Sequence, residues 1–279
     1  MTSDGLSTPS PQARDLMLGI LRCQHLEQAL DPLGKHPCRK VVGAQWSVPI
    51  ADRRRRFAQE HELPEPWSGE IEHALILFVS SNPSGSSPSG VKRRGETGPR
   101  ASCTDDALVD YYHRRFETEI VDGRYHANAD GSRGKYQPFW GGTNSIAKQL
   151  LPGARPGRDY VLTELVRCKS QDERGVDDAL STCSEAYLKR TLALAGNAQV
   201  IVALGKKARG WFQTHAKPCL ADSSTISCVE EVRLDVWPER TFTLLALGHP
   251  SGGEMRSPER VLPPDQLERV RERLRTARG

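Results

Sequence analysis

Four short apolar runs along the chain have the length of β-strands. They are ALILFVSS (74–81), YVLTELV (160–166), AQVIVALG (198–205) and FTLLALGH (242–249). Each run is nearly continuous rather than alternating, as expected of strands that are buried on both faces of a sheet. The pattern therefore predicts a central sheet of four mostly parallel strands.

Helical stretches separate and follow these runs, over residues 144–151, 178–195, 206–215 and 263–277. The last of them has Pro and Asp at its expected start. Strands that alternate with helices indicate a doubly wound, three-layer α/β/α fold. In such folds the binding site lies beyond the carboxyl ends of the strands.

Two regions lie outside this pattern. We expect residues 1–70 to form a helical and loop segment that packs on a core domain of residues 71–279. Within that domain, residues 84–138 form a long insertion, for which we expect a helix over 105–120 and a hairpin over 121–136. Insertions of this length in compact domains are commonly functional.

Composition narrows the class of protein only slightly. The chain is 37% hydrophobic and 27% charged, as in ordinary globular proteins. No apolar run approaches the roughly 18–20 residues of a membrane span, and the N-terminus lacks the apolar region of a signal peptide. We therefore expect a cytoplasmic protein of a prokaryote, monomeric and without a membrane partner.

Charge is unevenly distributed along the chain, although the net charge is only +4. Arginine and lysine gather in three blocks, at 52–57, 91–100 and 269–279. A solvated surface explains any one block. The three together favour a polyanionic partner, with nucleic acid as the first choice.

The seven cysteines of a cytosolic chain favour thiols or a metal site over disulfides. Cys23 and Cys38 are 15 positions apart, and so are Cys168 and Cys183. Four thiolates suit an iron–sulfur cluster or zinc. The other three cysteines show no such spacing and are expected to be incidental thiols: Cys103, Cys219 and Cys228.

Polar motifs stand at the ends of the predicted strands. Asn82 in SSNPSG follows the first strand, Glu164 in TELVRC ends the second, and His249 in GHPSGG ends the fourth. Asn-Pro also starts ordinary turns, and a histidine at a sheet edge can be structural. Their convergence at one edge favours a functional site.

Taken in order, these motifs resemble those of the uracil-DNA glycosylase superfamily, and within it the iron–sulfur branch. The likeness covers about residues 70–260 and the two N-terminal cysteines. VLTELVRCKS, the second cysteine, YLKRTLAL and VIVALGKKA follow that branch, and LGHPSGGEMR is similar to its His-Pro-Ser loop. The resemblance implies an α/β/α DNA glycosylase of the nucleoid, which flips out a base and hydrolyses its N-glycosidic bond to leave an abasic site.

The resemblance also implies roles for individual residues. Asn82 would orient the attacking water, because cleavage through an oxocarbenium-like transition state needs little more. His249 would hydrogen-bond the base O2 and stabilise charge on the departing pyrimidine. The residues beside Asn82 would line the base pocket: Ser81, Pro83 and Ser84. The loop after His249 would contact DNA, through Pro250 and Ser251 at phosphates and through Met255 and Arg256 in the gap left by the flipped nucleotide.

Phe139 and Trp140 in QPFWGGTNS have two interpretations. They are core aromatics, or they form the stacking platform for the extruded base that the resemblance implies. Phe139 is the stronger candidate for stacking.

By the same resemblance the four spaced cysteines would hold an iron–sulfur cluster of the 4Fe–4S type. The cluster would have a structural role and would pin the N-terminal segment beside the DNA channel. His25 and His36 lie two positions from Cys23 and Cys38, so a structural zinc site with mixed Cys and His ligands remains open.

Glu164 departs from the branch. The iron–sulfur relatives read Thr-Asn-x-x-Lys-Cys where this chain reads TELVRC, and that asparagine recognises uracil. An ionised glutamate only accepts hydrogen bonds, so it would face the lone pairs of uracil O4. Cytosine offers an N4 amino donor instead. A protonated Glu164 would also donate to cytosine N3 or uracil O4, and an ion pair with Arg167 would keep Glu164 away from the base altogether.

The target expected from Glu164 is a cytosine-type base. Removal of ordinary cytosine would destroy the cell's own genome, so the substrate should carry a mark, as in phage DNA with modified cytosines. The 84–138 insertion would line the pocket for that mark. The alternatives are a repair glycosylase for uracil or another deaminated base, and a non-catalytic, metal-bearing nucleic-acid-binding protein.

Overall fold

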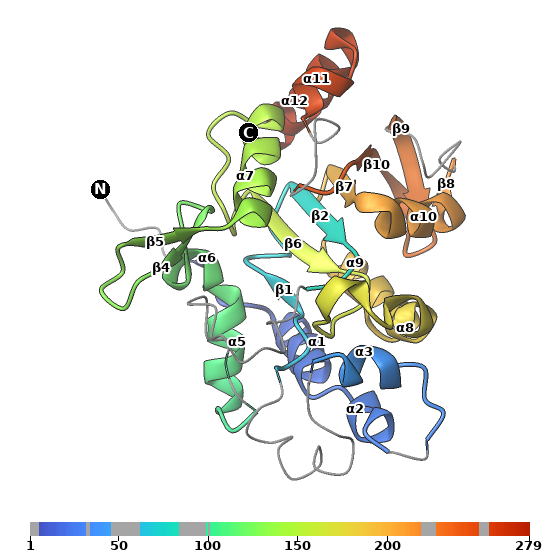
Figure 1. The fold of residues 1–279 in the computed structure, drawn as a ribbon. Coiled ribbons are helices and arrows are strands. Elements are labelled where there is room, and N and C mark those ends of the chain that lie inside the picture. Colours follow the sequence, from blue (N-terminus) through green and yellow to red (C-terminus); the bar gives the residue numbers. More distant parts are fainter. Residues whose placement is uncertain are drawn as a thin grey trace.

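The centre of the fold is a mixed sheet of seven strands. The computed structural model describes residues 6–31, 34–45, 62–83, 99, 101–218, 227–250 and 257–279. Within these residues the strand order is β1-β6-β2-β7-β10-β9-β8 (Figure 1). The strands are β1 (Trp67–Ser68), β2 (Ile76–Ser80), β6 (Tyr160–Glu164), β7 (Val200–Leu204), β8 (Ala216–Lys217), β9 (Ser227–Leu234) and β10 (Trp237–Leu247).

The expected count of four strands was wrong. The four apolar runs do form adjacent parallel strands, in the order β6-β2-β7-β10. Antiparallel strands extend the sheet on both sides, with β1 on β6, and β9 and then β8 on β10. β1 and β8 have two residues each, too few for a hydrophobic pattern. β9 is mostly half-exposed, so its sequence SCVEEVRL lacks the apolar continuity of a central strand.

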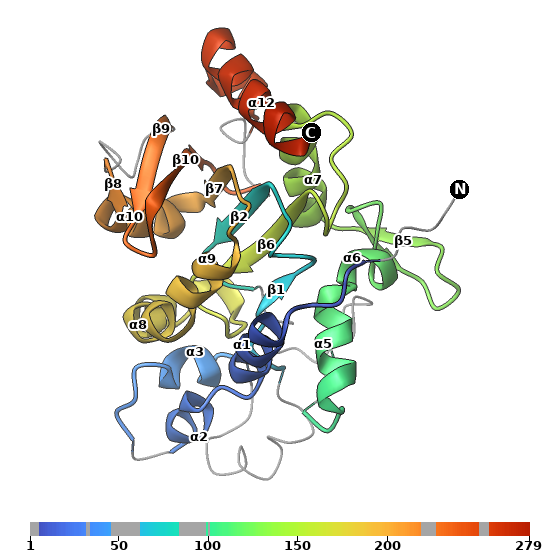
Figure 2. The same ribbon diagram turned by 180° about the vertical axis from the view of Figure 1, so that it is seen from behind.

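Helices cover both faces of the sheet, because successive side chains of each strand point to opposite sides. One face packs against α7 (Pro138–Leu150), α11 (Pro258–Val261) and α12 (Pro264–Arg278). The other face packs against α1 (Pro11–Leu21), α8 (Val176–Cys183), a π-helical segment (Ser184–Leu188), α9 (Lys189–Leu194) and α10 (Gly205–His215). The view from behind shows α7 and α12 above the sheet and α1, α8 and α9 below it (Figure 2).

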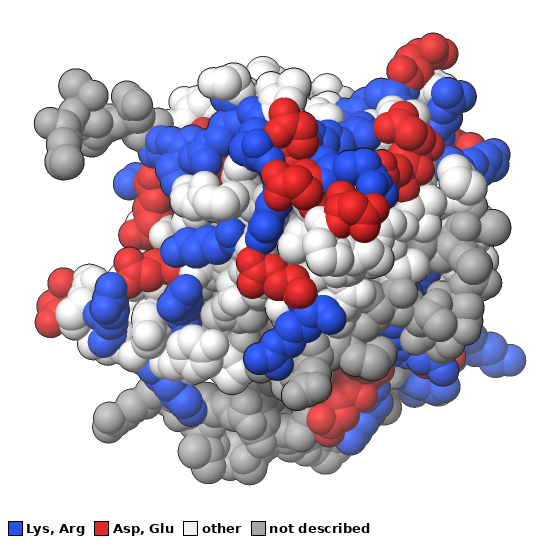
Figure 3. Space-filling view, turned by 90° about the horizontal axis from the view of Figure 1, so that it is seen from above, with Lys and Arg blue, Asp and Glu red and all other residues white. Residues whose placement is uncertain are grey.

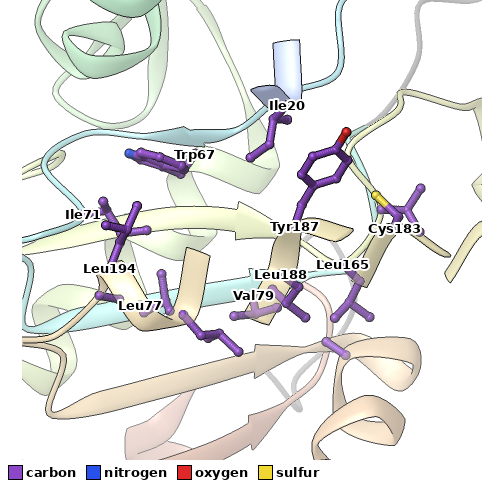
Figure 4. Close-up of a cluster of buried hydrophobic side chains, with 14 of the residues drawn as sticks. Ile20, Trp67, Ile71, Leu77, Val79, Leu165, Cys183, Tyr187, Leu188 and Leu194 are labelled. Atoms are coloured by element: carbon purple, nitrogen blue, oxygen red, sulfur yellow. The ribbon is translucent and has the colours of Figure 1, made fainter. Parts of the chain in front are cut away.

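The N-terminal helices share the hydrophobic core of the sheet. α1 buries Leu16, Met17 and Ile20 against residues of β2 and α9. The close-up in Figure 4 shows Ile20 beside Trp67 and Tyr187 within one apolar cluster. Two short helices, α2 (His25–Ala29) and α3 (Arg39–Gly43), complete this side.

The insertion between β2 and α7 is partly described. Its expected helix is divided at Arg114 into α5 (Asp105–His113) and α6 (Arg115–Thr118). The expected hairpin is present, and a third strand makes it a small antiparallel sheet of β3 (Ile120–Val121), β4 (Tyr125–Ala127) and β5 (Arg133–Tyr136). β4 and β5 project from the body of the molecule and lead into α7 (Figure 1). Residues 84–98 and 100 lie outside the described part of the chain.

The C-terminal arginine block is largely paired within the chain. Arg269 and Arg273 bind Glu230 and Glu231 of β9, and Arg275 binds Glu268 and Glu272 of its own helix. Positive and negative side chains accordingly intermingle on the face seen from above (Figure 3). This block is therefore not a free basic stripe. Block 52–57 and all but residue 99 of block 91–100 lie outside the described residues.

None of the helices within the described ranges is long and apolar enough to cross a membrane.

A glycine in α7 sets the distance between this helix and the loop after β10. A Cβ added at Gly142 would lie 2.6 Å from Pro250 Cβ and 2.9 Å from its carbonyl oxygen. We predict that Gly142→Ala lowers the free energy of unfolding by about 1–3 kcal/mol, the typical cost of overpacking. Gly210→Ala in α10, where nothing lies within 4 Å, should instead raise it by about 0.5–1 kcal/mol. Urea denaturation measures both, and a Gly142→Ala variant as stable as the parent would contradict the packing.

Candidate functional site

The parallel strands bring the three polar motifs to one edge of the sheet. Since β2, β6, β7 and β10 run in the same direction, their carboxyl ends lie together. Pairing between β2 and β6 continues past the strands, because the backbone N–H groups of Leu165 and Val166 donate to Ser80 O and Ser81 O at 2.9 and 3.0 Å. The turn that carries Asn82 is thereby attached to the segment after Glu164.

Asn82 is oriented by the segment that follows Cys168. Its Nδ2 donates to Ser170 Oγ at 3.0 Å, to Cys168 O at 3.4 Å and to Pro83 O at 2.8 Å. The backbone N–H of Ser170 donates in turn to Pro83 O at 3.2 Å. Its amide nitrogen is thus occupied, and Oδ1 is the atom that can accept a hydrogen bond from a water.

Ser81 has a partner that sequence reasoning missed. Its hydroxyl donates to a carboxylate oxygen of Glu173, in the 3₁₀ turn Gln171–Glu173. Lys207 Nζ lies 3.8 Å from the other oxygen of Glu173. No periodicity marks Glu173 in KSQDERG, so only tertiary packing places this carboxylate at the strand ends.

His249 stacks on Phe139 at this edge. Their ring centroids are 5.4 Å apart with an interplanar angle of 29°. Burial lowers the pKa of His249, and the charge of Glu173 only partly opposes this effect. The ring is therefore mostly neutral near pH 7 and keeps one N–H that can donate a hydrogen bond.

The two adjacent aromatics have different surroundings. Trp140 packs edge-on against Phe116 with centroids 5.2 Å apart, and the Arg115 guanidinium lies 4.9 Å from its ring centroid. Phe139 is half-buried and contacts His249. Both aromatics are half-buried and pack against the core, and Phe139 is the one whose ring contacts His249.

Glu164 is a buried carboxyl on the α7 face of the sheet, 8% exposed. It accepts a hydrogen bond from Ser80 on the neighbouring strand. Arg167 lies toward the opposite face, where it donates to Thr191 Oγ1 at 2.8 Å and also to Thr163 Oγ1 and Pro66 O. No ion pair joins Arg167 to Glu164 within the described ranges.

A second acidic residue binds the neighbouring cations. Glu65 accepts from Arg115 Nη1 at 2.7 Å, and Lys169 Nζ lies 3.0 Å from its other oxygen. Burial opposes ionisation, but these two cations outweigh it and hold the pKa of Glu65 at about 2. Arg115 also donates to Ser68 Oγ at 3.2 Å, so its guanidinium is directed toward β1.

Burial raises the pKa of Glu164 to about 8. The Ser80 hydrogen bond and the charges of Arg167 and Arg115 oppose this shift, whereas the nearby charge of Glu65 adds to it. Near pH 7 the group is therefore mostly a neutral acid, which has one hydrogen to donate and a carbonyl oxygen that accepts.

The four spaced cysteines line one pocket on the opposite face of the sheet. Cys23 follows α1, Cys38 precedes α3, Cys168 follows β6 and Cys183 ends α8. The pocket is also lined by apolar residues, by Tyr187, which Figure 4 shows near Cys183, and by His25. Cys103 and Cys228 lie elsewhere, and Cys219 falls outside the described residues.

The thiols are close enough to affect one another's ionisation. Burial raises the pKa of Cys38 to about 12 and that of Cys183 to about 11, and the charges of neighbouring thiols contribute at Cys38, Cys168 and Cys183. A backbone N–H from Arg167 points at Cys183 Sγ from 3.3 Å. Among the described residues, no group of three His, Cys, Asp or Glu side chains has the spacing to hold a single metal ion. Four thiols in one pocket fit a group that needs thiolates, such as an iron–sulfur cluster, and His25 beside them also suits a zinc site with mixed Cys and His ligands.

Several expected site residues are not described. Ser84, Ser251, Met255 and Arg256 lie outside the described ranges. Pro250 is described, and it packs against Gly142 of α7.

The fold and site define an α/β protein whose candidate site residues gather at the carboxyl edge of parallel strands. The family model of the Uracil DNA glycosylase superfamily matches residues 118–275, more than half of the chain. The chain belongs to this superfamily, whose members are DNA glycosylases and act on DNA. The match includes Phe139, Glu164 and His249, whereas Asn82 and the two N-terminal cysteines precede it. No curated protein matches the chain.

The buried carboxyl should make stability depend on pH. The pKa of Glu164 is raised from 4.5 to about 8 on folding, so its contribution is fully present below about pH 4.5 and is lost as pH rises to about 8. Glu164→Gln removes this loss. We predict that the variant gains stability relative to the parent, by up to a few kcal/mol, between about pH 5 and about pH 9. Urea denaturation at the two pH values tests this, and a constant difference would show that Glu164 stays ionised.

Proposed function

We propose that this protein is a DNA glycosylase that removes a modified cytosine-type base from foreign, phage-type DNA and leaves an abasic site. The observation that carries the proposal is the environment of Glu164. Its carboxyl is buried at the carboxyl edge of the strands and accepts a hydrogen bond from the Ser80 hydroxyl, while Glu65 binds Arg115, and Arg167 donates to hydroxyl and carbonyl groups on the other face. A buried acid that is not neutralised by an ion pair is suited to reading a polar ligand.

The two protonation states of Glu164 read bases differently. The neutral acid donates to cytosine N3 and accepts from its N4 amino group, and it equally donates to uracil O4 and accepts from N3–H. The carboxylate has no hydrogen to donate, so it accepts from cytosine N4 but faces the N3 lone pair, and it accepts from uracil N3–H but faces the lone pairs of O4. Because position 4 carries a donor in cytosine and an acceptor in uracil, a carboxylate directed at this position favours cytosine.

Three other residues at the carboxyl ends of the strands would stack on the base, hold the water and stabilise the leaving group. Phe139 would stack on the extruded base, as aromatic side chains do in base-flipping enzymes. Asn82 would hold the water through its Oδ1. His249 would donate to the base O2 and stabilise the negative charge that develops on the leaving pyrimidine.

The target base should carry a chemical modification that distinguishes it from the cytosine of the cell's own DNA. An enzyme that released unmodified cytosine would destroy the DNA of its own cell. The insertion follows Asn82 and Pro83 directly in the sequence and ends just before Phe139, so we expect it to accommodate a bulky substituent on cytosine. Defence against DNA that carries such bases is the function that follows.

Released bases identify the substrate. We predict that duplexes and single strands with modified cytosines yield free modified base and abasic DNA, as measured by mass spectrometry, and that plain-cytosine DNA yields none. Asn82→Ala should slow release by about 10²-fold or more. The pH dependence gives a second readout. Uracil release should fall more steeply than release of the cytosine-type base as pH rises through the pKa of Glu164, which lies near 8 in the free protein.

Glu164→Gln is the matched control, because its amide copies the neutral acid and does not titrate. Its uracil release should stay constant over the pH range in which that of the parent falls.

Efficient uracil release at all pH values with none from modified cytosine would instead establish a repair glycosylase, which the raised pKa of Glu164 also favours. DNA binding without release of any base, unaffected by Asn82→Ala, would establish the non-catalytic alternative.

We also propose that Cys23, Cys38, Cys168 and Cys183 hold a 4Fe–4S cluster. The cluster would join the N-terminal helices to the segment that positions Asn82, so its role is structural. We predict absorbance at roughly 400 nm and about four iron atoms per chain in anaerobically purified protein. Both should be lost in Cys183→Ser and retained in Cys103→Ser, whose thiol lies outside the pocket. A colourless protein with one zinc per chain would establish the zinc site instead.

A further inference from the structure

The site holds a carboxylate with no role in the scheme above. Asn82 can orient a water, but an amide is too weak a base to take its proton. We propose that Glu173 is a catalytic residue that binds the attacking water together with Asn82 and accepts its proton. The inference rests on the proposed glycosylase function. It assigns the general base, the group that takes the proton of the attacking water, for which that function has named no residue.

Three elements converge on Glu173. The hydroxyl of Ser81, the residue before Asn82, donates to one carboxylate oxygen. Lys207 in α10 lies 3.8 Å from the other. His249 is close enough for the charge of Glu173 to influence its ionisation. The carboxylate therefore lies among the water-orienting turn, the first turn of α10 and the histidine expected to stabilise the leaving base.

The backbone holds this carboxylate in an unusual position. Asp172 and Glu173 have φ angles of 52° and 53°, and Gly175 follows with 78°. Left-handed conformations cost non-glycine residues roughly 1–2 kcal/mol each, and they persist where the surroundings enforce them. Gly175 is one such constraint, because a Cβ there would lie 2.3 Å from the backbone nitrogen of Val41 in α3. The turn is thus pressed against the N-terminal helices and directs Glu173 toward Ser81.

Exposure of Glu173 suits a group that must meet water. Its side chain is 46% exposed, so the second lone pairs of its oxygens are open beside those used by Ser81 and Lys207. Bound DNA would cover this surface and exclude bulk water, which strengthens the electrostatic effect of the carboxylate on a cationic sugar.

The proposed step balances as follows. The C1′–N1 bond breaks, and its electron pair leaves with the base, whose O2 is held by His249. The water oxygen bonds to C1′, and the water proton passes to Glu173. The base anion takes a proton from solvent, and Glu173 returns its own to solvent. The products are the free base and an abasic sugar with a hydroxyl at C1′.

Single-turnover excision tests this assignment. We predict that Glu173→Gln slows excision by about 10²-fold or more while the dissociation constant for DNA changes by less than about threefold. The pH–rate profile of the parent should show an acid limb that Glu173→Gln lacks. Asp172→Asn is the matched control, because it removes a carboxylate from the neighbouring exposed position of the same turn. Asp177→Asn, which removes the other partner of Lys207, should also be silent.

Rescue by added formate distinguishes a catalytic role of Glu173 as general base from a purely structural role. Added formate should restore excision in Glu173→Ala, because a small carboxylate can occupy the space and accept the proton. A Glu173→Gln rate within about threefold of the parent would overturn the assignment. So would a slowed variant that keeps the acid limb and is not rescued by formate. A parent protein that releases no base from any DNA would overturn the glycosylase function itself, a distinct result.

Discussion

Backbone hydrogen bonding between β2 and β6 continues beyond both strands, and the rest of the site depends on it. Leu165 and Val166 donate to Ser80 and Ser81, and Ser170 donates to Pro83. These bonds fix the Asn82 turn on the segment that carries Glu164 and leads to the cysteine pocket. A change in register at one strand would therefore move Asn82, Glu164 and Cys168 together, the residues proposed to orient the water, read the base and bind the cluster.

Arg167 and Glu164 lie on opposite faces of the sheet, and this separation helps to explain why Glu164 is mostly protonated near pH 7. Side chains alternate between faces, so Arg167 with its hydroxyl partners lies toward α9, and Glu164 lies toward α7. On the α7 side Glu65 binds Arg115 and Lys169. The charges of Arg167 and Arg115 lower the pKa of Glu164 by less than burial raises it, so the group is mostly neutral near pH 7. In the proposed function, the neutral acid reads either base, and the ionised acid favours a base that carries a donor at position 4.

Local signals in the sequence were sufficient for the central strands and their helices. Continuous apolar runs identified β2, β6, β7 and β10, since strands buried on both faces need no polar alternation. The same reasoning missed β1, β8 and β9, because short edge strands are specified by their neighbours rather than by their own pattern. The sequence analysis also counted the C-terminal arginines among the groups that would bind a polyanion. In the structure these arginines instead pair with glutamates of β9 and α12.

The sequence by itself determined the four parallel strands, the placement of Asn82, Glu164 and His249 at strand ends, and the paired spacing of the cysteines. Each of these follows from residue type and local order along one chain. Tertiary structure alone decided that Phe139 rather than Trp140 meets His249, that Glu65 binds Arg115, and that Glu173 reaches Ser81. These contacts join segments far apart in sequence, and only packing brings such segments within the few ångströms over which hydrogen bonds and buried charges act.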